Sequence, residues 1–333
     1  MSLSSSQLLF LSTLFLGTTL SVSSTSWFGT WVGLELNLLS FIPLISTKNN
    51  QYSSEAALKY FLIQALGSSI IIMSASFMLL SSESASFLMV VALLLKSGAA
   101  PFHFWFPSVM EGLQWPQAIL LMTIQKIAPM SLLSYTVSDH TFSIFTAAIV
   151  LSALVGAIGG MNQTLLRKIM AYSSINHMAW MMAAILISES SWLIYFLFYS
   201  AVSSSIALLF NHQEAFHISH VLNHTGYSSQ LKLLTFMSLL SLGGLPPFTG
   251  FIPKWFIIQE MVSAGFFSVL AILLASALIT LFYYLRISMA AITISSPKTK
   301  WSSKTSNSAY LTPSMLWLNS FGLLTPSLVA LII

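Results

Sequence analysis

The stretch FLMVVALLLKSGAAPFHFWF, residues 87–106, decides the fold class of this chain. It is long and apolar enough to cross a lipid bilayer, yet Lys96 stands in its middle. Two further apolar stretches carry Lys126 and Lys254, and a fourth carries Glu35. A charge at the bilayer centre costs about 2.5–3.5 kcal/mol on insertion scales, so these four groups must face a polar interior. Such groups usually mark an ion or proton path, and static ion pairs that hold helices together are the alternative.

The composition is that of an integral membrane protein. Hydrophobic residues make up 56% of the 333 residues and charged residues only 6%, whereas a soluble domain carries about 25% charged residues. No polar segment is long enough to fold outside the membrane. We therefore expect one transmembrane domain over residues 1–333. The basic residues form no patch, so nucleic acid is not an expected partner.

The chain contains no cysteine. This excludes disulfides and thiolate ligation of zinc or iron–sulfur clusters, so we expect any redox centre to lie on a partner and no cofactor to bind this chain. Four histidines, His212, His217, His220 and His224, cluster in one polar stretch. Metal ligation by them is conceivable, but a solvated loop is the favoured interpretation, and we expect no metal site.

Apolar runs and their interruptions predict an all-α membrane protein with about eleven transmembrane helices. The expected spans are 7–24, 27–46, 55–80, 86–106, 115–137, 141–160, 169–187, 191–210, 231–258, 264–291 and 312–333. Apart from the three mid-membrane lysines, all nine basic residues fall in or beside the connections after the second, sixth, eighth and tenth spans. The positive-inside rule then places these connections and the N-terminus inside, and the C-terminus outside.

One ten-residue pattern occurs twice. GAAPFHFWFP (98–107) and GLPPFTGFIP (244–253) both read G-x-x-P-F-x-x-x-x-P and lie 146 residues apart. Proline inside a span removes a backbone donor, and a broken helix at membrane depth is tolerated only inside protein or beside a water-filled cavity. We expect interruptions around 98–101 and 243–247, as in transporters built from repeats. Chance similarity over ten positions is the alternative.

A fifth candidate, His177, lies near the centre of the seventh span, with Ser173, Ser174 and Asn176 beside it. Histidine titrates near neutral pH, so it would suit a proton relay between lysines. A neutral histidine that is hydrogen-bonded across a helix interface is the alternative.

Five stretches carry a family resemblance: GLELNLLSFIPL, LLLKSGAAPFHFWFPSVMEG, TIQKIAPM, GAIGGMNQTLLRKIMAYSSINHMAWM and LSLGGLPPFTGFIPKWFIIQEM. They cover most of residues 27–262 and resemble the chain 2 subunits of mitochondrial NADH:ubiquinone oxidoreductase, respiratory complex I. This family is related to the Mrp-type cation/proton antiporter subunits. The resemblance implies two inverted five-helix repeats, each with one interrupted helix. Eleven spans fit the animal form, which lacks the first three helices of its bacterial relatives.

The resemblance also implies roles for individual residues. The family's pump glutamate matches Glu35, its paired lysine Lys96, its central lysine Lys126 and its exit-side lysine Lys254. It implies a proton-translocating subunit of the mitochondrial inner membrane, with the N-terminus on the matrix side and the C-terminus facing the intermembrane space. Its partners would be other membrane-arm subunits and membrane lipids. NADH, FMN, the iron–sulfur clusters and ubiquinone would be held by partner subunits.

These residues suggest a charge-gated mechanism. Burial favours a neutral lysine, and a nearby carboxylate such as Glu35 favours the charged form of Lys96. Moving or protonating Glu35 would release a proton from Lys96 toward Lys126, and His177 with water would lead on to Lys254. We therefore expect an ion pair between Glu35 and Lys96. Two other functions stay open: a free-standing cation/proton antiporter, and a structural spacer whose charges only pin helices together.

Overall fold

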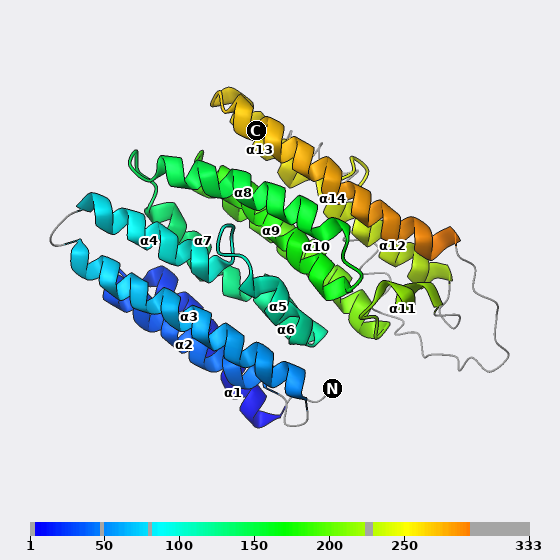
Figure 1. The fold of residues 1–333 in the computed structure, drawn as a ribbon, viewed down its shortest axis with the longest axis horizontal. Coiled ribbons are helices and arrows are strands. Elements are labelled where there is room, and N and C mark those ends of the chain that lie inside the picture. The colour runs from blue at the N-terminus through cyan, green and yellow to red at the C-terminus, as the bar shows by residue number, and fades with distance from the viewer. Residues whose placement is uncertain (1–3, 47–49, 79–81, 224–228, 294–333) are drawn as a thin grey trace. The chain divides into compact units, whose positions relative to one another are not determined.

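The computed structural model describes residues 4–46, 50–78, 82–223 and 229–293. Within these residues the regular elements are helices, apart from an isolated bridge between Leu165 and His217. The prediction of an all-α fold is therefore confirmed. The chain divides into two compact units, residues 1–152 and 153–333 (Figure 1). Whether they form the single domain expected from the sequence stays a prediction.

In the first unit, the first four helices pack side by side in the order of the sequence. Its described helices are α1 (Ser5–Ser23), α2 (Trp27–Ile45), α3 (Gln51–Phe77), α4 (Ser82–Ser97), α5 (Trp105–Gly112), α6 (Trp115–Met122) and α7 (Ile124–Tyr135). Helix α2 packs between α1 and α3, and α3 also packs against α4 and α5 (Figure 1). Helix α7 packs against both α1 and α4.

Small residues bring α1 and α2 into close contact. The side chain of Ser26 accepts a hydrogen bond from the amide of Gly29, which caps the start of α2 after a short turn. A Cβ atom on Gly17 would lie only 2.8 Å from the backbone nitrogen of Asn37. Glycine is needed there because it lets the two backbones approach, as is usual for helices in lipid. This contact fixes the part of α2 that carries Asn37.

The second unit is built around one buried helix. Helix α8 (Phe142–Met161) runs across the boundary between the units, and the helices that follow are α9 (Leu166–Ile185), α10 (Glu189–His212), α11 (Ile218–Asn223), α12 (Ser229–Gly243), α13 (Phe251–Ser263) and α14 (Phe267–Thr293). Helix α9 is buried along nearly its whole length, and α10, α13 and α14 all pack against it. Polar side chains on α9 therefore lie inside protein.

Both expected helix interruptions are present. Residues 98–104 separate α4 from α5, and residues 244–250 separate α12 from α13. Each preceding helix is followed directly by a glycine with positive φ, Gly98 at +74° and Gly244 at +80°. Glycine adopts this conformation without the steric penalty that a side chain would bring, so it ends both helices in the same way.

The two breaks also share their hydrogen bonds, position for position. The amide of Ala99 donates to the carbonyl of Leu94 at 3.2 Å, and the amide of Leu245, 146 residues later, donates to the carbonyl of Leu240 at 3.4 Å. Bonds of this kind satisfy carbonyls that would otherwise be left open at a helix end. The same backbone geometry at matching positions supports a structural repeat over chance similarity.

The expected spans coincide with helices of the structure wherever the structure describes them. Each of the first ten coincides with one helix or with a pair of helices around an irregular residue or break, and the eleventh, 312–333, lies outside the described residues. By length and apolarity alone, seven described helices could cross a bilayer, with α6 and α7 taken together. The broken spans 86–106 and 231–258 and the polar helix α9 do not meet that criterion. The count of eleven stays a prediction.

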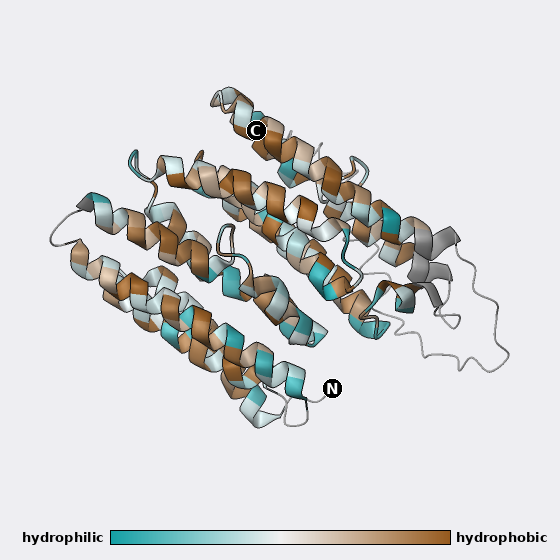
Figure 2. Ribbon diagram, viewed as in Figure 1, coloured by the Kyte–Doolittle hydropathy of each residue, from teal (hydrophilic) through white to brown (hydrophobic). Residues whose placement is uncertain are grey.

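Apolar side chains lie on the outside and several charged ones inside. Phe28 and Leu278 are each 70% exposed, whereas Lys126 is 2% exposed. Figure 2 shows apolar residues along the helices, with hydrophilic residues near several helix ends. Exposed apolar surface on this scale is expected of a protein that faces lipid, and it would be unstable in water.

Gly244→Ala should destabilise the second break for two separable reasons. Alanine at positive φ costs about 1–2 kcal/mol, and its Cβ would lie 2.9 Å from Cδ of Lys254. Gly265→Ala isolates the backbone cost, because Gly265 has φ +79° and nothing lies within 4 Å of a Cβ there. Gly243→Ala brings neither cost, since its nearest neighbours lie at 3.7 Å. The midpoint of thermal unfolding in lipid nanodiscs should be lowest for Gly244→Ala, higher for Gly265→Ala and highest for Gly243→Ala. Three equal midpoints would contradict this account of the break.

Candidate functional site

Four of the five residues predicted from the sequence are almost fully buried. The exposed fractions are 2% for Lys126, 5% for Lys96, 7% for Lys254 and 8% for His177, while Glu35 is half-buried. The first unit contains Glu35, Lys96 and Lys126, and the second contains His177 and Lys254. Each unit therefore has its own buried titratable groups.

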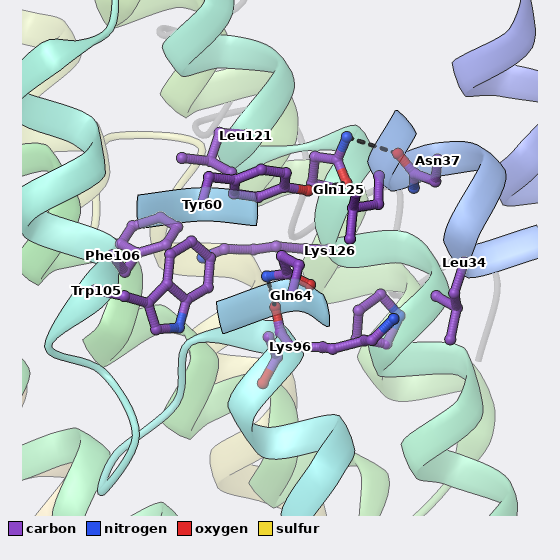
Figure 3. Close-up of a pocket in the computed structure, with 13 residues that line it drawn as sticks. Leu34, Asn37, Tyr60, Gln64, Lys96, Trp105, Phe106, Leu121, Gln125 and Lys126 are labelled. Atoms are coloured by element: carbon purple, nitrogen blue, oxygen red, sulfur yellow. Dashed lines mark hydrogen bonds between the residues drawn. The ribbon is translucent and has the colours of Figure 1, made fainter. Parts of the chain in front are cut away.

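In the first unit, Lys96 and Lys126 line one small cavity (Figure 3). Its volume is about 20 Å³, which is room for about one water molecule. The lining residues come from α2, α3, α4, α5, α6 and α7 and include several polar side chains: Leu34, Asn37, Leu38, Tyr60, Gln64, Lys96, Ser97, Trp105, Phe106, Leu121, Gln125, Lys126 and Pro129. Lys126 therefore shares this cavity with polar side chains of other helices, among them Asn37 and Gln64.

Helix α3 positions Lys96 at the end of α4. The side-chain amide of Gln64 donates to the backbone carbonyl of Lys96 at 3.1 Å. One turn further along α3, a Cβ on Gly67 would lie 2.8 Å from Cγ of Lys96. The lysine stem therefore occupies space that only glycine leaves open, and its carbonyl is satisfied although the helix ends there.

The expected ion pair between Glu35 and Lys96 is not formed. Among the described residues, no salt bridge joins the two side chains. The fold gives the reason: α3 packs against both α2, which carries Glu35, and α4, which carries Lys96. The carboxylate and the ammonium therefore come from helices that lie on either side of a shared neighbour, without a salt bridge between them.

Lys126 lies on the first turn of α7, against an aromatic ring. Its Nζ atom is 4.9 Å from the ring centroid of Phe106, within the range of a cation–π interaction. Thr123 precedes this turn with φ −112° and ψ −80°, which interrupts the helical path between α6 and α7. The sequence did not predict this irregular residue, because no proline or glycine marks it.

Lys254 bonds to the end of the helix broken in the second unit. Its Nζ atom donates to the carbonyl of Gly243, the last residue of α12, at 2.9 Å. It also lies 5.9 Å from the ring centroid of Trp180. The carbonyl end of a helix carries a partial negative charge, so the break itself supplies an attraction for the ammonium.

His177 is hydrogen-bonded across a helix interface. Its Nδ1 atom lies 2.7 Å from the hydroxyl of Tyr195 on α10, and its ring packs against Tyr199 at a centroid distance of 4.9 Å. Tyr195 in turn stacks on Trp180, beside Lys254. This bond is the one expected of a structural histidine, and a hydroxyl is also a partner that can exchange a proton. The relay role stays a prediction.

Sequence reasoning missed the aromatic and amide residues around these groups. Phe106, Trp180 and Tyr195 contact the titratable side chains, but aromatic residues occur throughout the spans and nothing in their spacing marks them. Gln64 and Gln125 could have been identified from the sequence more easily than the aromatic residues, because a buried amide needs hydrogen-bond partners inside the bundle. Buried amines and a buried imidazole can bind and release protons, and two of the amines, Lys96 and Lys126, also line a water-sized cavity. Proton transfer is therefore the chemistry that the arrangement supports.

Comparison with known proteins shows the family of this chain. The family model described as NADH:quinone oxidoreductase/Mrp antiporter, TM, matches residues 24–280. NADH-ubiquinone oxidoreductase chain 2 of Aedes aegypti is 49% identical over 329 residues, which cover 95% of this chain and 96% of that protein. The chain 2 protein of Anopheles gambiae is 46% identical over 302 residues, 88% of each chain.

A solved structure extends the likeness to the fold. A chain of respiratory complex I from Thermus thermophilus matches with a TM-score of 0.85 and 26% identity, covering 99% of this chain and 80% of that one. The stretches that contain Glu35, Lys96, Lys126, His177 and Lys254 all lie inside the part matched by the family model. The chain therefore belongs to the NADH:quinone oxidoreductase/Mrp antiporter family of membrane subunits, and within it to the NADH-ubiquinone oxidoreductase chain 2 proteins.

Proposed function

We propose that this chain is a membrane-arm subunit of a proton-pumping NADH:ubiquinone oxidoreductase in the mitochondrial inner membrane. Its relatives carry that enzyme's name, and its lysines are buried in an apolar helical protein. Oxidation of NADH and reduction of ubiquinone, with FMN and the iron–sulfur clusters, take place on partner subunits. Other membrane-arm subunits and lipid surround this chain, which contributes a path for protons and binds no redox cofactor itself.

The cavity shared by Lys96 and Lys126 is the observation that carries this proposal. When two lysines line one small cavity, each ammonium disfavours the charged form of the other. When one lysine is neutral and the other is protonated, a water molecule in the cavity can carry the proton from one Nζ atom to the other. The side chains of Gln64 and Ser97 add polar groups to the same cavity, so a water molecule there would find the two to four partners that buried water needs.

Glu35 controls the first step of the proposed sequence. A nearby carboxylate favours the charged form of an amine, so ionised Glu35 would stabilise the Lys96 ammonium. Protonation or displacement of Glu35 removes this attraction, so the proton leaves Nζ of Lys96 and passes through water to Nζ of Lys126. Because the carboxylate acts without contact, no salt bridge has to be broken for the step to occur.

The second unit offers a matching pair of groups. His177 can pass a proton through its hydrogen bond to Tyr195. Lys254 holds its ammonium against the end of α12 and releases the proton when that carbonyl or Trp180 moves away. We propose that His177 and Lys254 continue the path that Glu35, Lys96 and Lys126 begin, with Lys254 at the exit.

A free-standing cation/proton antiporter is the second candidate, because the family description also names Mrp antiporters. Affinity purification through a tag on this chain separates the two functions. Co-purification with flavin- and cluster-containing subunits supports the proposal. Recovery of this chain alone, with cation/proton exchange in vesicles, would replace the proposal with the antiporter.

The proposed orientation can be tested directly because the chain has no cysteine of its own. Asp139 and Thr164 are both exposed and lie in successive connections, one on each side of α8. We propose that the first faces the intermembrane space and the second the matrix. An impermeant maleimide should label Asp139→Cys in mitoplasts and Thr164→Cys only after the membrane is opened. The reverse labelling would invert the proposed topology.

Lys126→Met should leave an assembled complex with strongly reduced proton-coupled turnover. Methionine nearly preserves the volume, but the titratable group is lost. We therefore expect turnover to fall by at least about tenfold; a group that transfers protons in catalysis contributes roughly 10²–10⁴-fold. The measurements are quinone reductase activity and proton uptake per assembled complex. Lys59→Met is the control, since Lys59 is exposed and pairs with Glu55 on the surface of α3. Equal turnover in both variants would exclude the proposed role of Lys126.

Glu35→Gln should slow proton uptake more than it weakens assembly. The amide keeps the shape of the side chain but removes the charge that favours protonated Lys96. Glu55→Gln provides the matched control, because Glu55 is exposed and its partner Lys59 lies on the same helix. We expect Glu35→Gln to lower proton uptake per electron while Glu55→Gln does not; normal coupling in Glu35→Gln would mean that Lys96 does not depend on this carboxylate.

A further inference from the structure

We propose that Gln125 is the positioning residue for Lys126, and that its side-chain amide links Lys126 to the helix that carries Glu35. This inference rests on the proposed function for its effect on turnover, but the geometry that it assigns can be tested independently. Figure 3 shows the amide of Gln125 between Tyr60 and Asn37, at the edge of the cavity that the two lysines line.

Both ends of the Gln125 amide are held. Its Oε1 atom accepts a hydrogen bond from the hydroxyl of Tyr60 at 3.1 Å, and its Nε2 atom donates to Oδ1 of Asn37 at 2.6 Å. Tyr60 and Asn37 are 2% and 3% exposed. A donor and an acceptor fixed on opposite sides leave one favoured orientation of the amide. We call the three side chains the amide bridge.

The irregular backbone at Thr123 explains why the bridge is needed. The amide of Lys126 donates to the carbonyl of Thr123, three residues earlier, at 3.1 Å, and the φ and ψ angles of Thr123 are not helical. The first turn of α7 is therefore not set by a continuous helical ladder from α6. A rotation by one residue, roughly 100° in an α-helix, would turn Lys126 out of the cavity and away from Phe106. Gln125, the preceding residue, ties this turn to two neighbouring helices and prevents that rotation.

The bridge also joins the helices that carry the other buried charges of the first unit. Asn37 lies on α2, two residues after Glu35, and its backbone is fixed by close packing against Gly17. Tyr60 lies on α3, one turn before Gln64, which holds the carbonyl of Lys96. A displacement of α2 therefore reaches the first turn of α7 through the hydrogen bond between Asn37 and Gln125, and a displacement of α3 reaches it through the bond from Tyr60.

The test compares three variants in the assembled enzyme complex. Gln125→Met removes both bonds of the bridge at similar volume. Tyr60→Phe removes one bond and leaves the bond to Asn37. Gln117→Met is the matched control: Gln117 also ties its helix to α2, by donating to the carbonyl of Leu44 at 2.7 Å, but it does not line the cavity. The readouts are turnover and proton uptake per assembled complex, together with the position of Lys126 in a density map of Gln125→Met.

We expect Gln125→Met to lower turnover per complex by at least about fivefold, since a ~1 Å misplacement of a reacting group can cost ~10²-fold. Tyr60→Phe should give a smaller loss, and Gln117→Met should keep normal turnover per complex. Lys126 should leave the face of Phe106 in the Gln125→Met map. If Gln125→Met does not assemble, turnover per complex and the position of Lys126 are measured in Tyr60→Phe instead.

Two results would overturn the assignment: normal turnover per complex in both bridge variants, or a Lys126 that stays over Phe106 once the bridge is broken. A bridge that only supported folding would reduce the amount of complex and leave turnover per complex unchanged. Lys126→Met is measured in parallel. If that variant is fully active, the proposed function fails, while the density map still decides whether Gln125 positions the lysine.

Discussion

An ammonium inside an apolar helix bundle depends on the electron-rich groups that the fold can place beside it. For Lys126 such a group is the ring of Phe106, and for Lys254 it is the carbonyl at the end of α12 together with Trp180. Lys96 forms no salt bridge with Glu35 among the described residues. These partners are neutral or distant, whereas a desolvated salt bridge would hold both charges in place. An amine whose charged form is only weakly stabilised can exchange its proton. Weak stabilisation therefore raises the free energy of the buried ammonium and at the same time permits proton transfer.

The helix breaks make this arrangement possible. A continuous helix satisfies its own carbonyls and has none to offer a lysine, whereas the end of α12 presents one to Lys254. Gly244 leaves the space that this lysine stem occupies, and Gly67 does the same for Lys96 beside the other break. Since each unit contains one break and one lysine next to it, the repeated pattern in the sequence supplies both the irregular backbone and the charge that uses it.

Much of the fold could be predicted from the sequence, because the effects of hydropathy and of proline on secondary structure are local. The spans, both interruptions and the burial of the three lysines follow from apolar length and from breakers within it. The prediction of a direct ion pair between Glu35 and Lys96 was wrong, since the sequence could not show that α3 packs against both α2 and α4. The irregular residue Thr123 was missed because threonine does not mark a break. The aromatic partners could not be singled out among the many aromatic residues of the spans.

The magnitudes show why positioning matters as much as charge in this protein. A buried lysine costs about 2.5–3.5 kcal/mol, while a cation–π contact returns about 0.5–2 kcal/mol and a helix end about 0.3–2 kcal/mol. The charged and neutral forms therefore lie within a few kcal/mol of each other, close to the ~4 kcal/mol that moves one charge across an assumed ~180 mV. Near such a balance, a shift that removes one weak partner is enough to change the favoured protonation state. The buried hydrogen bonds around Gln125 then have a clear physical purpose: they fix the distance between Lys126 and Phe106, on which that balance depends.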